Sequence, residues 1–330
     1  MKKIAATIPT VANAGAYFQK NGLQVFMPFY HAISEEVLPH MKHLYTLRNK
    51  KQFINDLDYL LKHFTPVKLS EFLSGKYSAG FGKPPMVLSF DDGLIQCYTE
   101  IMPILLQKGI PATFFLNNAF IDNKAMFFRY KVSLLIEALS AVTDSQLIKA
   151  AELLKCNQKD IRKRLLAVSY VDREITDQVA NGFEFSFDTY MRKNPIYMGS
   201  IQIRKMQSEG FEFGSHGIDH PLFALLKKQA TIDHIKASVT DLAQQYDLDY
   251  KYFAFPFTDS GVEDVTIDVL FEKGIIDAGF GTAGLKDDKW PNYYQRVPME
   301  LFNKGAKAIL NGEINRRRIR TLAGKNMTSR

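Results

Sequence analysis

The chain has 330 residues, of which 46% are hydrophobic and 23% are charged, so it is long enough to bury a large core. It contains no run of about eighteen apolar residues, so we expect no membrane-spanning helix, and two cysteines are too few for a disulfide scaffold. The net charge of +7 comes without a recognisable nucleic-acid module, so we expect no nucleic-acid partner.

The N-terminal residues 1–16 have a charged start and several small residues. Pro9 and Asn13 interrupt the apolar part, which makes it thin for the core of a signal peptide. We therefore expect no cleaved signal, and a cytoplasmic or membrane-surface location, with export as the alternative.

Short apolar runs alternate with helical patterns in the first third of the chain. The runs are typical of buried strands, and the spacing of apolar residues between them is typical of amphipathic helices. Two such strands joined by a helix form a βαβ unit. The expected strands are 25–31, 86–90 and 111–116, and the expected helices are 50–63 and 94–108.

Between residues 124 and 194 the pattern is helical, with no clear strand. We interpret this segment as a helical insertion. Strands resume downstream, and their total of about seven, with helices between them, favours a single barrel domain over residues 1–330. The later expected strands are 211–216, 252–257, 276–281 and 293–298, and a last helix is expected over 300–310.

Chemistry-bearing side chains follow two of these strands. Asp91 and Asp92 come directly after a buried run, and His216 and His220 lie four positions apart in a stretch with Gly217 and Pro221. Two imidazoles and one carboxylate make a three-ligand metal site with a position left for water. On the residues alone, either aspartate can be the ligand, and the other can act as a base.

The order of these motifs resembles the polysaccharide deacetylase family, also called the NodB homology domain or carbohydrate esterase family 4. The resemblance covers about residues 24–118 and 197–298. Its opening also resembles members that act on exopolysaccharide or poly-N-acetylglucosamine. The stretches that carry it are Met27-Pro28-Phe29-Tyr30-His31, Ser89-Phe90-Asp91-Asp92-Gly93, Gly214-Ser215-His216-Gly217-Ile218-Asp219-His220-Pro221 and Phe253-Ala254-Phe255-Pro256-Phe257.

The resemblance implies a distorted (β/α)7 barrel and metal-dependent removal of an N-acetyl, or alternatively an O-acetyl, group from a carbohydrate. Asp92, His216 and His220 would hold one divalent ion, with Asp91 as the general base. Zinc is the favoured ion, with cobalt, nickel or iron as alternatives. Residues 255–257 (Phe255, Pro256 and Phe257) would line the substrate groove, and the Phe257 N–H would help to hold the oxyanion.

Two departures from the family pattern concern the remaining catalytic groups. The chain has no histidine after His234, where many members place a general acid. We expect His31, which ends a neighbouring strand, to donate that proton. The arginine that usually precedes the aromatic-proline motif is also absent, and we expect Arg296 to replace it by pairing with Asp91.

Two other functions remain open from the sequence. The chain could be a glycan-binding or assembly protein of the same fold with little catalysis. It could instead be a deacylase or deformylase of a lipid-linked sugar, in which case the basic residues 312–330, interpreted as a solvated tail, would contact an anionic membrane surface. The sequence assigns neither the sugar nor the oligomeric state.

Overall fold

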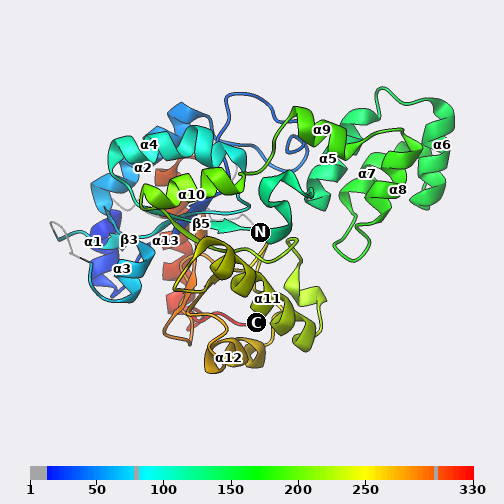
Figure 1. Cartoon of the computed structure of the whole chain (residues 1–330). Coiled ribbons are helices and arrows are strands. Elements are labelled where there is room, and N and C mark those ends of the chain that lie inside the picture. The colour runs from blue at the N-terminus through cyan, green and yellow to red at the C-terminus, as the bar shows by residue number, and fades with distance from the viewer. Residues whose placement is uncertain (1–12, 78–81, 301–303) are drawn as a thin grey trace, which may run out of the picture.

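The computed structural model describes residues 13–77, 82–300 and 304–330. Residues 1–12, which hold most of the stretch considered above as a signal segment, lie outside the described residues. Figure 1 shows an α/β body from which a group of helices projects to one side. No helix within the described ranges is long and apolar enough to cross a membrane.

The body is a parallel sheet curled into a nearly closed barrel. Every pair of neighbouring strands is parallel, and the strands follow one another around the barrel in the order β10-β1-β4-β5-β6-β7-β8-β9. The strands are β1 (Pro28–Tyr30), β4 (Leu88–Phe90), β5 (Ala112–Leu116), β6 (Glu212–Ser215), β7 (Tyr252–Ala254), β8 (Ala278–Gly281), β9 (Tyr293–Gln295) and β10 (Val297–Pro298).

The two strands at the ends of this order belong to one stretch of chain. Only Arg296 separates β9 from β10; β9 pairs with β8, while β10 pairs with β1. Residues 293–298 therefore act as a single closing strand, and the barrel has seven strand positions. The predicted (β/α)7 barrel is confirmed.

The strands are short and almost wholly buried, which explains why their sequences are apolar runs and not alternating patterns. Aromatic rings pack across neighbouring strands. Phe90 of β4 stacks on Phe114 of β5 at 4.9 Å between centroids, and Phe114 packs at 5.7 Å from Phe213 of β6. These contacts fix the lateral order of the strands whose ends carry the polar residues.

Helices surround the barrel, largely where the apolar spacing predicts them. They are α1 (Ala14–Lys20), α2 (Lys50–His63), α3 (Leu69–Leu73), α4 (Met102–Lys108), α10 (Ser200–Ser208), α11 (Lys228–Tyr246), α12 (Asp264–Glu272) and α13 (Ala306–Leu322), with a small two-stranded sheet of β2 (Thr65–Pro66) and β3 (Pro85–Met86).

Two of the predicted helices differ from the structure. The helix expected over 94–108 contains a π-helical turn, Cys97–Ile101, before α4, which ends at Gly109 with φ 62°. The last helix does not occupy 300–310: residues 301–303 lie outside the described residues, and α13 runs from Ala306 to Leu322. Much of the expected tail is thus helical.

The expectation of a solvated tail over residues 312–330 is wrong for Arg317 and Arg330, whose side chains are buried, whereas Arg316 is exposed. Arg317 is 8% exposed and forms an ion pair with Asp287 at 2.8 Å. The Arg318 guanidinium lies 5.1 Å from the ring of Tyr17. Asp287 lies in the loop between β8 and β9, and Arg330 forms an ion pair at 2.6 Å with Asp259, which follows β7, so ion pairs hold the segment against the barrel.

The segment 124–194 is helical, as predicted. Its helices share an apolar cluster with the loop after β1, through residues such as Met41 and Ile196. Because the segment follows β5, it leaves the barrel at the carboxyl end of the strands. Its helices are α5 (Phe128–Ala138), α6 (Asp144–Leu153), α7 (Ile161–Leu166), α8 (Ile175–Gly182) and α9 (Phe187–Lys193).

Candidate metal centre

The four predicted polar side chains meet at the carboxyl end of the barrel. Asp91 and Asp92 follow β4, and His216 follows β6, one strand beyond β5. Asp92 and His220 both have positive φ angles, 72° and 61°. Such angles are costly for residues with a side chain and concentrate at functional sites.

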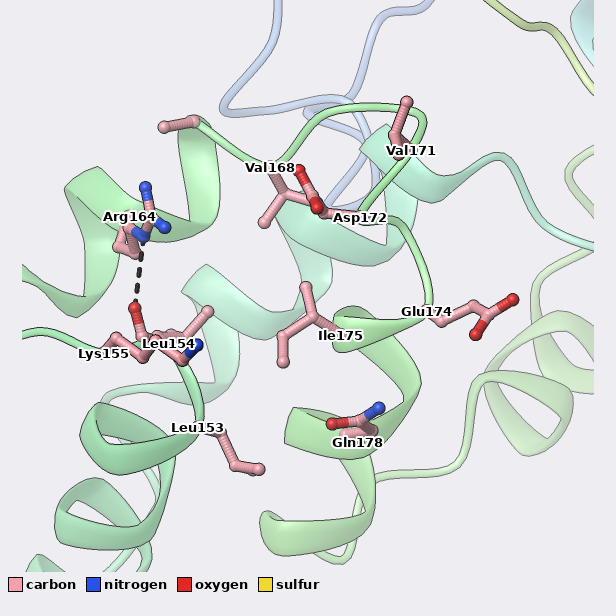
Figure 2. A pocket seen from close by; sticks show the side chains of 11 residues that line it. Leu153, Leu154, Lys155, Arg164, Val168, Val171, Asp172, Glu174, Ile175 and Gln178 are labelled. Carbon is pink, nitrogen blue, oxygen red and sulfur yellow. Dashed lines mark hydrogen bonds between the residues drawn. The ribbon is translucent and has the colours of Figure 1, made fainter.

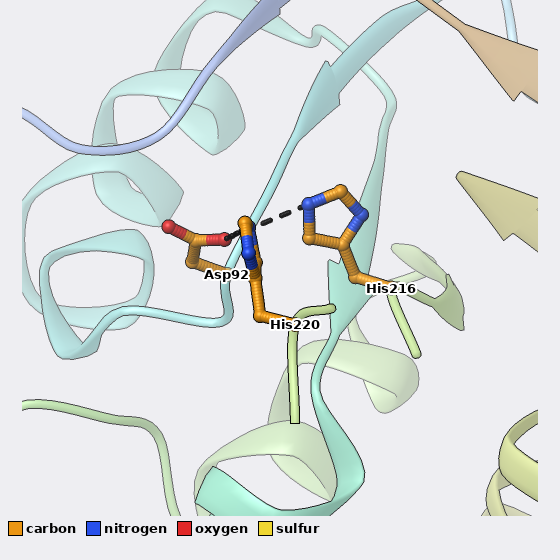
Figure 3. Close-up of side chains that lie close together, drawn as sticks. All are labelled: Asp92, His216 and His220. Carbon is orange, nitrogen blue, oxygen red and sulfur yellow. Dashed lines mark ion pairs between the residues drawn. The ribbon is translucent and has the colours of Figure 1, made fainter. Parts of the chain in front are cut away.

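Asp92, His216 and His220 form the cluster drawn in Figure 3, in which their ligand atoms all lie within 4.8 Å of one another. Asp92 Oδ1 lies 3.2 Å from His220 Nε2 and 3.6 Å from His216 Nε2. All three residues are buried. Asp92 Oδ1 has no hydrogen-bond partner among the described residues, although a buried polar atom normally has one. A bound cation would satisfy it.

The surroundings of the cluster suit metal ligation. His216 Nδ1 donates to the carbonyl oxygen of Ala254 at 2.8 Å, which leaves its Nε2 lone pair directed at Asp92. Burial lowers the pKa of His216 to about 4, so the ring is neutral, as a ligand must be. Tyr130 donates from its hydroxyl to Asp92 Oδ2 at 3.2 Å and orients the carboxylate.

Asp91 lies beside this cluster and is paired with Arg296. Nη1 of Arg296 donates to Oδ1 at 2.6 Å, and Nη2 donates to Oδ2 at 2.8 Å. Burial alone would raise the pKa of Asp91, but the Arg296 guanidinium and His216 hold it below its ordinary value. The guanidinium is itself buried between the rings of Phe29 and Phe115, at 4.4 and 5.1 Å.

His31 is held by an acid that the sequence analysis did not identify. Its Nδ1 lies 2.5 Å from Glu300 Oε2, and Glu300 Oε1 accepts from the backbone N–H of His31 at 3.1 Å. Burial lowers the pKa of His31, but Glu300 outweighs this effect and raises it to about 9. The ring is 26% exposed and packs 5.2 Å from that of Tyr45.

A cavity of about 280 Å³ connects these groups. Its lining includes His31, Asp91, Asp92, His216 and His220, together with Phe29, Leu44, Tyr45, Phe127, Arg129, Phe257 and Thr282. The predicted base, the predicted acid and the three predicted metal ligands thus share one cavity with an aromatic rim.

The aromatic-proline motif contributes less to this cavity than predicted. Phe257, 43% exposed and at φ 58°, lines the cavity, and its ring packs 4.5 Å from His220. Phe255 is fully buried and packs against Phe223 and Phe253, and Pro256 is buried as well. The expectation that Phe255 and Pro256 line the groove is therefore wrong, because the chain turns at Phe257 and leaves the two preceding residues in the core.

Two contributions escaped the sequence reasoning. Glu300 follows the closing strand directly, so the rule that polar residues after a parallel strand share one end of the barrel could have identified it. The insertion supplies Tyr130 to Asp92, and Phe127 and Arg129 to the cavity. No sequence spacing signals that contribution.

A second hollow, of about 340 Å³, lies wholly within the insertion (Figure 2). It is lined by apolar side chains such as Leu153, Val168 and Ile175, with Arg164 Nε donating to the carbonyl oxygen of Leu154 at its edge. It shares no lining residue with the cavity above the barrel, and its lining residues lack a cluster of metal ligands.

The sequence profile described as polysaccharide deacetylase matches residues 79–275 of the chain. The chain belongs to the polysaccharide deacetylase family. This membership places it among the hydrolases that act on carbon–nitrogen bonds other than peptide bonds. The matched range begins before β4 and ends after α12, and it contains Asp91, Asp92, His216 and His220.

Solved structures share the barrel at low sequence identity. The deacetylase PplD of Streptococcus pyogenes, solved with acetate, matches with a TM-score of 0.55 and 14% identity, covering 87% of this chain and 96% of that one. IcaB from Ammonifex degensii matches with a TM-score of 0.53 and 16% identity, over 88% and 97% of the two chains.

A de-N-acetylase from Aggregatibacter actinomycetemcomitans matches with a TM-score of 0.54 and 14% identity, over 86% of this chain and 98% of that one. No curated protein matches the chain by sequence. The structural likeness, at these identities, supports the fold. The family assignment rests on the profile and agrees with the expectation drawn from the motifs.

Proposed function

We propose that the chain is a metal-dependent carbohydrate deacetylase that hydrolyses an N-acetyl group on an amino sugar. The observation that carries the proposal is the convergence of Asp92 Oδ1 with two histidine Nε2 atoms beside a second, ion-paired aspartate in one cavity. A divalent ion bound by Asp92, His216 and His220 would supply Lewis acidity for a water and for the acyl oxygen. Zinc suits this donor set best.

Asp91 is the proposed general base. Its two oxygens each accept one hydrogen bond from Arg296, and each keeps a further lone pair for the proton of the attacking water. The guanidinium keeps the carboxyl ionised in a buried place where it would otherwise be costly. Arg296 therefore acts as a positioning residue for Asp91.

His31 is the proposed general acid. The departing nitrogen needs a proton, and His31 lines the same cavity in a form that Glu300 keeps protonated at neutral pH. The Phe257 N–H, which forms no hydrogen bond within the described part of the chain, is the proposed donor to the developing oxyanion. In this proposal the Asp91 carboxylate, paired with Arg296, accepts one proton, and the His31 imidazolium, paired with Glu300, donates the other.

The alternative functions receive less support from the structure. The glycan-binding hypothesis came from a missing histidine and a missing arginine; His31 lines the cavity and Arg296 pairs with Asp91, which supports them as replacements. The hypothesis of a membrane-bound lipid-linked substrate needs the basic C-terminal segment near the site. That segment is held against the barrel by ion pairs of Arg317 with Asp287 and of Arg330 with Asp259, and none of its residues lines the cavity.

The test compares wild type with Asp91→Asn in two measurements: metal content after dialysis, and acetate released from a panel of N-acetylated and O-acetylated sugars. We expect metal in both proteins and acetate only from wild type, because the amide of the Asp91→Asn variant cannot accept the proton. His216→Ala, which removes a ligand, is the matched control and should lose the metal. Metal in both proteins with no acetate from either would favour the glycan-binding function.

A further inference from the structure

The insertion places one unpaired cation in the cavity. Arg129 of α5 lines the cavity and is half-buried, and no carboxylate of the described residues pairs with it. Its Nη1 donates to the carbonyl oxygen of Leu166 at 2.8 Å, and the guanidinium lies 5.8 Å from the ring of Phe128. A guanidinium that is partly removed from water and has no carboxylate partner is suited to bind an anion in the cavity that it lines.

The other charges of the cavity are already balanced. Asp91 is neutralised by Arg296, and His31 by Glu300. Asp92 remains as the one uncompensated carboxylate in the lining, and a divalent ion bound there would exceed its charge by one. The loaded cavity is therefore positive even before Arg129 is counted, which favours negatively charged ligands.

We infer that Arg129 binds an anionic substituent, a carboxylate or a phosphate, on the sugar whose acetamido group is hydrolysed; this inference rests on the proposed function. The guanidinium fork matches both groups, because it can donate two parallel hydrogen bonds to either. The carbonyl oxygen of Leu166 accepts from Nη1 of Arg129, which leaves Nη2 and Nε free to donate to a ligand. The insertion, in this role, selects acidic glycans.

The inference is tested by binding to metal-free protein, so that the ion itself attracts no anion. Titration calorimetry in the presence of a chelator would compare N-acetylmuramic acid, N-acetylglucosamine 6-phosphate and neutral N-acetylglucosamine. We expect wild type to bind at least one acidic sugar about tenfold more tightly than the neutral one, the usual contribution of a charged hydrogen bond. Arg129→Gln should lose this preference, and Arg129→Lys should keep part of it.

Lys131→Gln is the control. It removes the same charge from the same helix, but Lys131 pairs with Asp177 at 2.7 Å and does not line the cavity. The preference for acidic sugars should survive in this variant. Equal affinities for acidic and neutral sugars in wild type, a preference that persists in Arg129→Gln, or no binding of the acidic sugars would each overturn the inference.

Acetate release separates this inference from the proposed function. Release from neutral N-acetylated sugars, without any preference for acidic ones, would leave the deacetylase intact and remove only the anion site. Binding of acidic sugars through Arg129, with no acetate release from them or from neutral sugars, would keep the anion site and overturn the deacetylase.

Discussion

Arg296, the single residue between β9 and β10, donates two hydrogen bonds to Asp91 at the end of β4. The segment that closes the barrel therefore also holds the proposed base. Arg296 is 1% exposed and Asp91 is 2% exposed, so neither charge can be satisfied by water if the other is removed. Through this ion pair, the strand that closes the barrel also keeps the Asp91 carboxyl ionised.

Arg296→Met should destabilise the protein strongly. Breaking a buried ion pair leaves an uncompensated charge, which costs about 3–5 kcal/mol. Urea denaturation at neutral pH would measure the free energy of unfolding. The double variant Arg296→Met with Asp91→Asn is the control and should lose less than the single variant, since no buried charge remains. A single variant as stable as wild type would contradict this role of the ion pair.

Glu300→Gln should move the basic limb of the pH–turnover profile to lower pH. In wild type, Glu300 raises the pKa of His31 from 6.5 to about 9, so His31 can donate a proton over the neutral range. Without the carboxylate, burial dominates, and the limb should fall by about one pH unit or more. An unchanged basic limb would exclude His31 as the acid.

The same pair predicts a dependence of stability on pH. The folded pKa of His31, about 9, lies above its ordinary value of 6.5. The stabilisation from the pair should therefore be complete below about pH 6.5 and decline as the pH rises through about 9. The free energy of unfolding of wild type and of Glu300→Gln would be measured between about pH 6.5 and pH 9. The difference between the two proteins should shrink as the pH rises.

Tyr130→Phe should weaken metal binding without abolishing it. The Tyr130 hydroxyl orients Asp92 from outside the ligand set, and loss of such a partner typically lowers metal affinity about tenfold or more. Competition against a chromophoric chelator would measure the affinity. Tyr246→Phe is the control: its hydroxyl bonds Ser200 Oγ at 3.1 Å, neither residue lines the cavity, and the variant should bind metal like wild type.

Tyr170→Phe should loosen the loop that carries both histidines. The Tyr170 hydroxyl lies 2.9 Å from each carboxylate oxygen of Asp219, which sits between His216 and His220. Loss of this contact should cost about 1 kcal/mol and raise amide hydrogen exchange over residues 216–220. Thr189→Ala, which removes a hydroxyl that accepts from Arg192 on the same helix α9, should leave exchange in the loop unaltered. Unchanged exchange in Tyr170→Phe would show that the insertion does not brace the loop.

Local sequence determined the barrel and most of its site. Short apolar runs bounded by turn residues favour buried strands, and residues that follow parallel strands meet at one end of the barrel. Asp91, Asp92 and His216 could therefore be placed together. The expectation for Phe255 and Pro256 failed, while that for Phe257 held, because the chain turns after β7. The φ of 58° at Phe257 brings that side chain to the cavity and leaves Phe255 in the core.

Only the tertiary structure decided the contacts between segments far apart in the chain. Glu300 reaches His31 across 269 positions, and Tyr130 reaches Asp92 from a helix outside the barrel. The spacing of apolar residues in the sequence indicates which face of a helix or strand is buried, but it does not indicate which other segment packs against that face. The sequence by itself therefore determined most of the elements, the candidate metal ligands and the family. The closing strand 293–298 and the insertion at the carboxyl ends of the strands decided which residues contact each of the proposed catalytic groups.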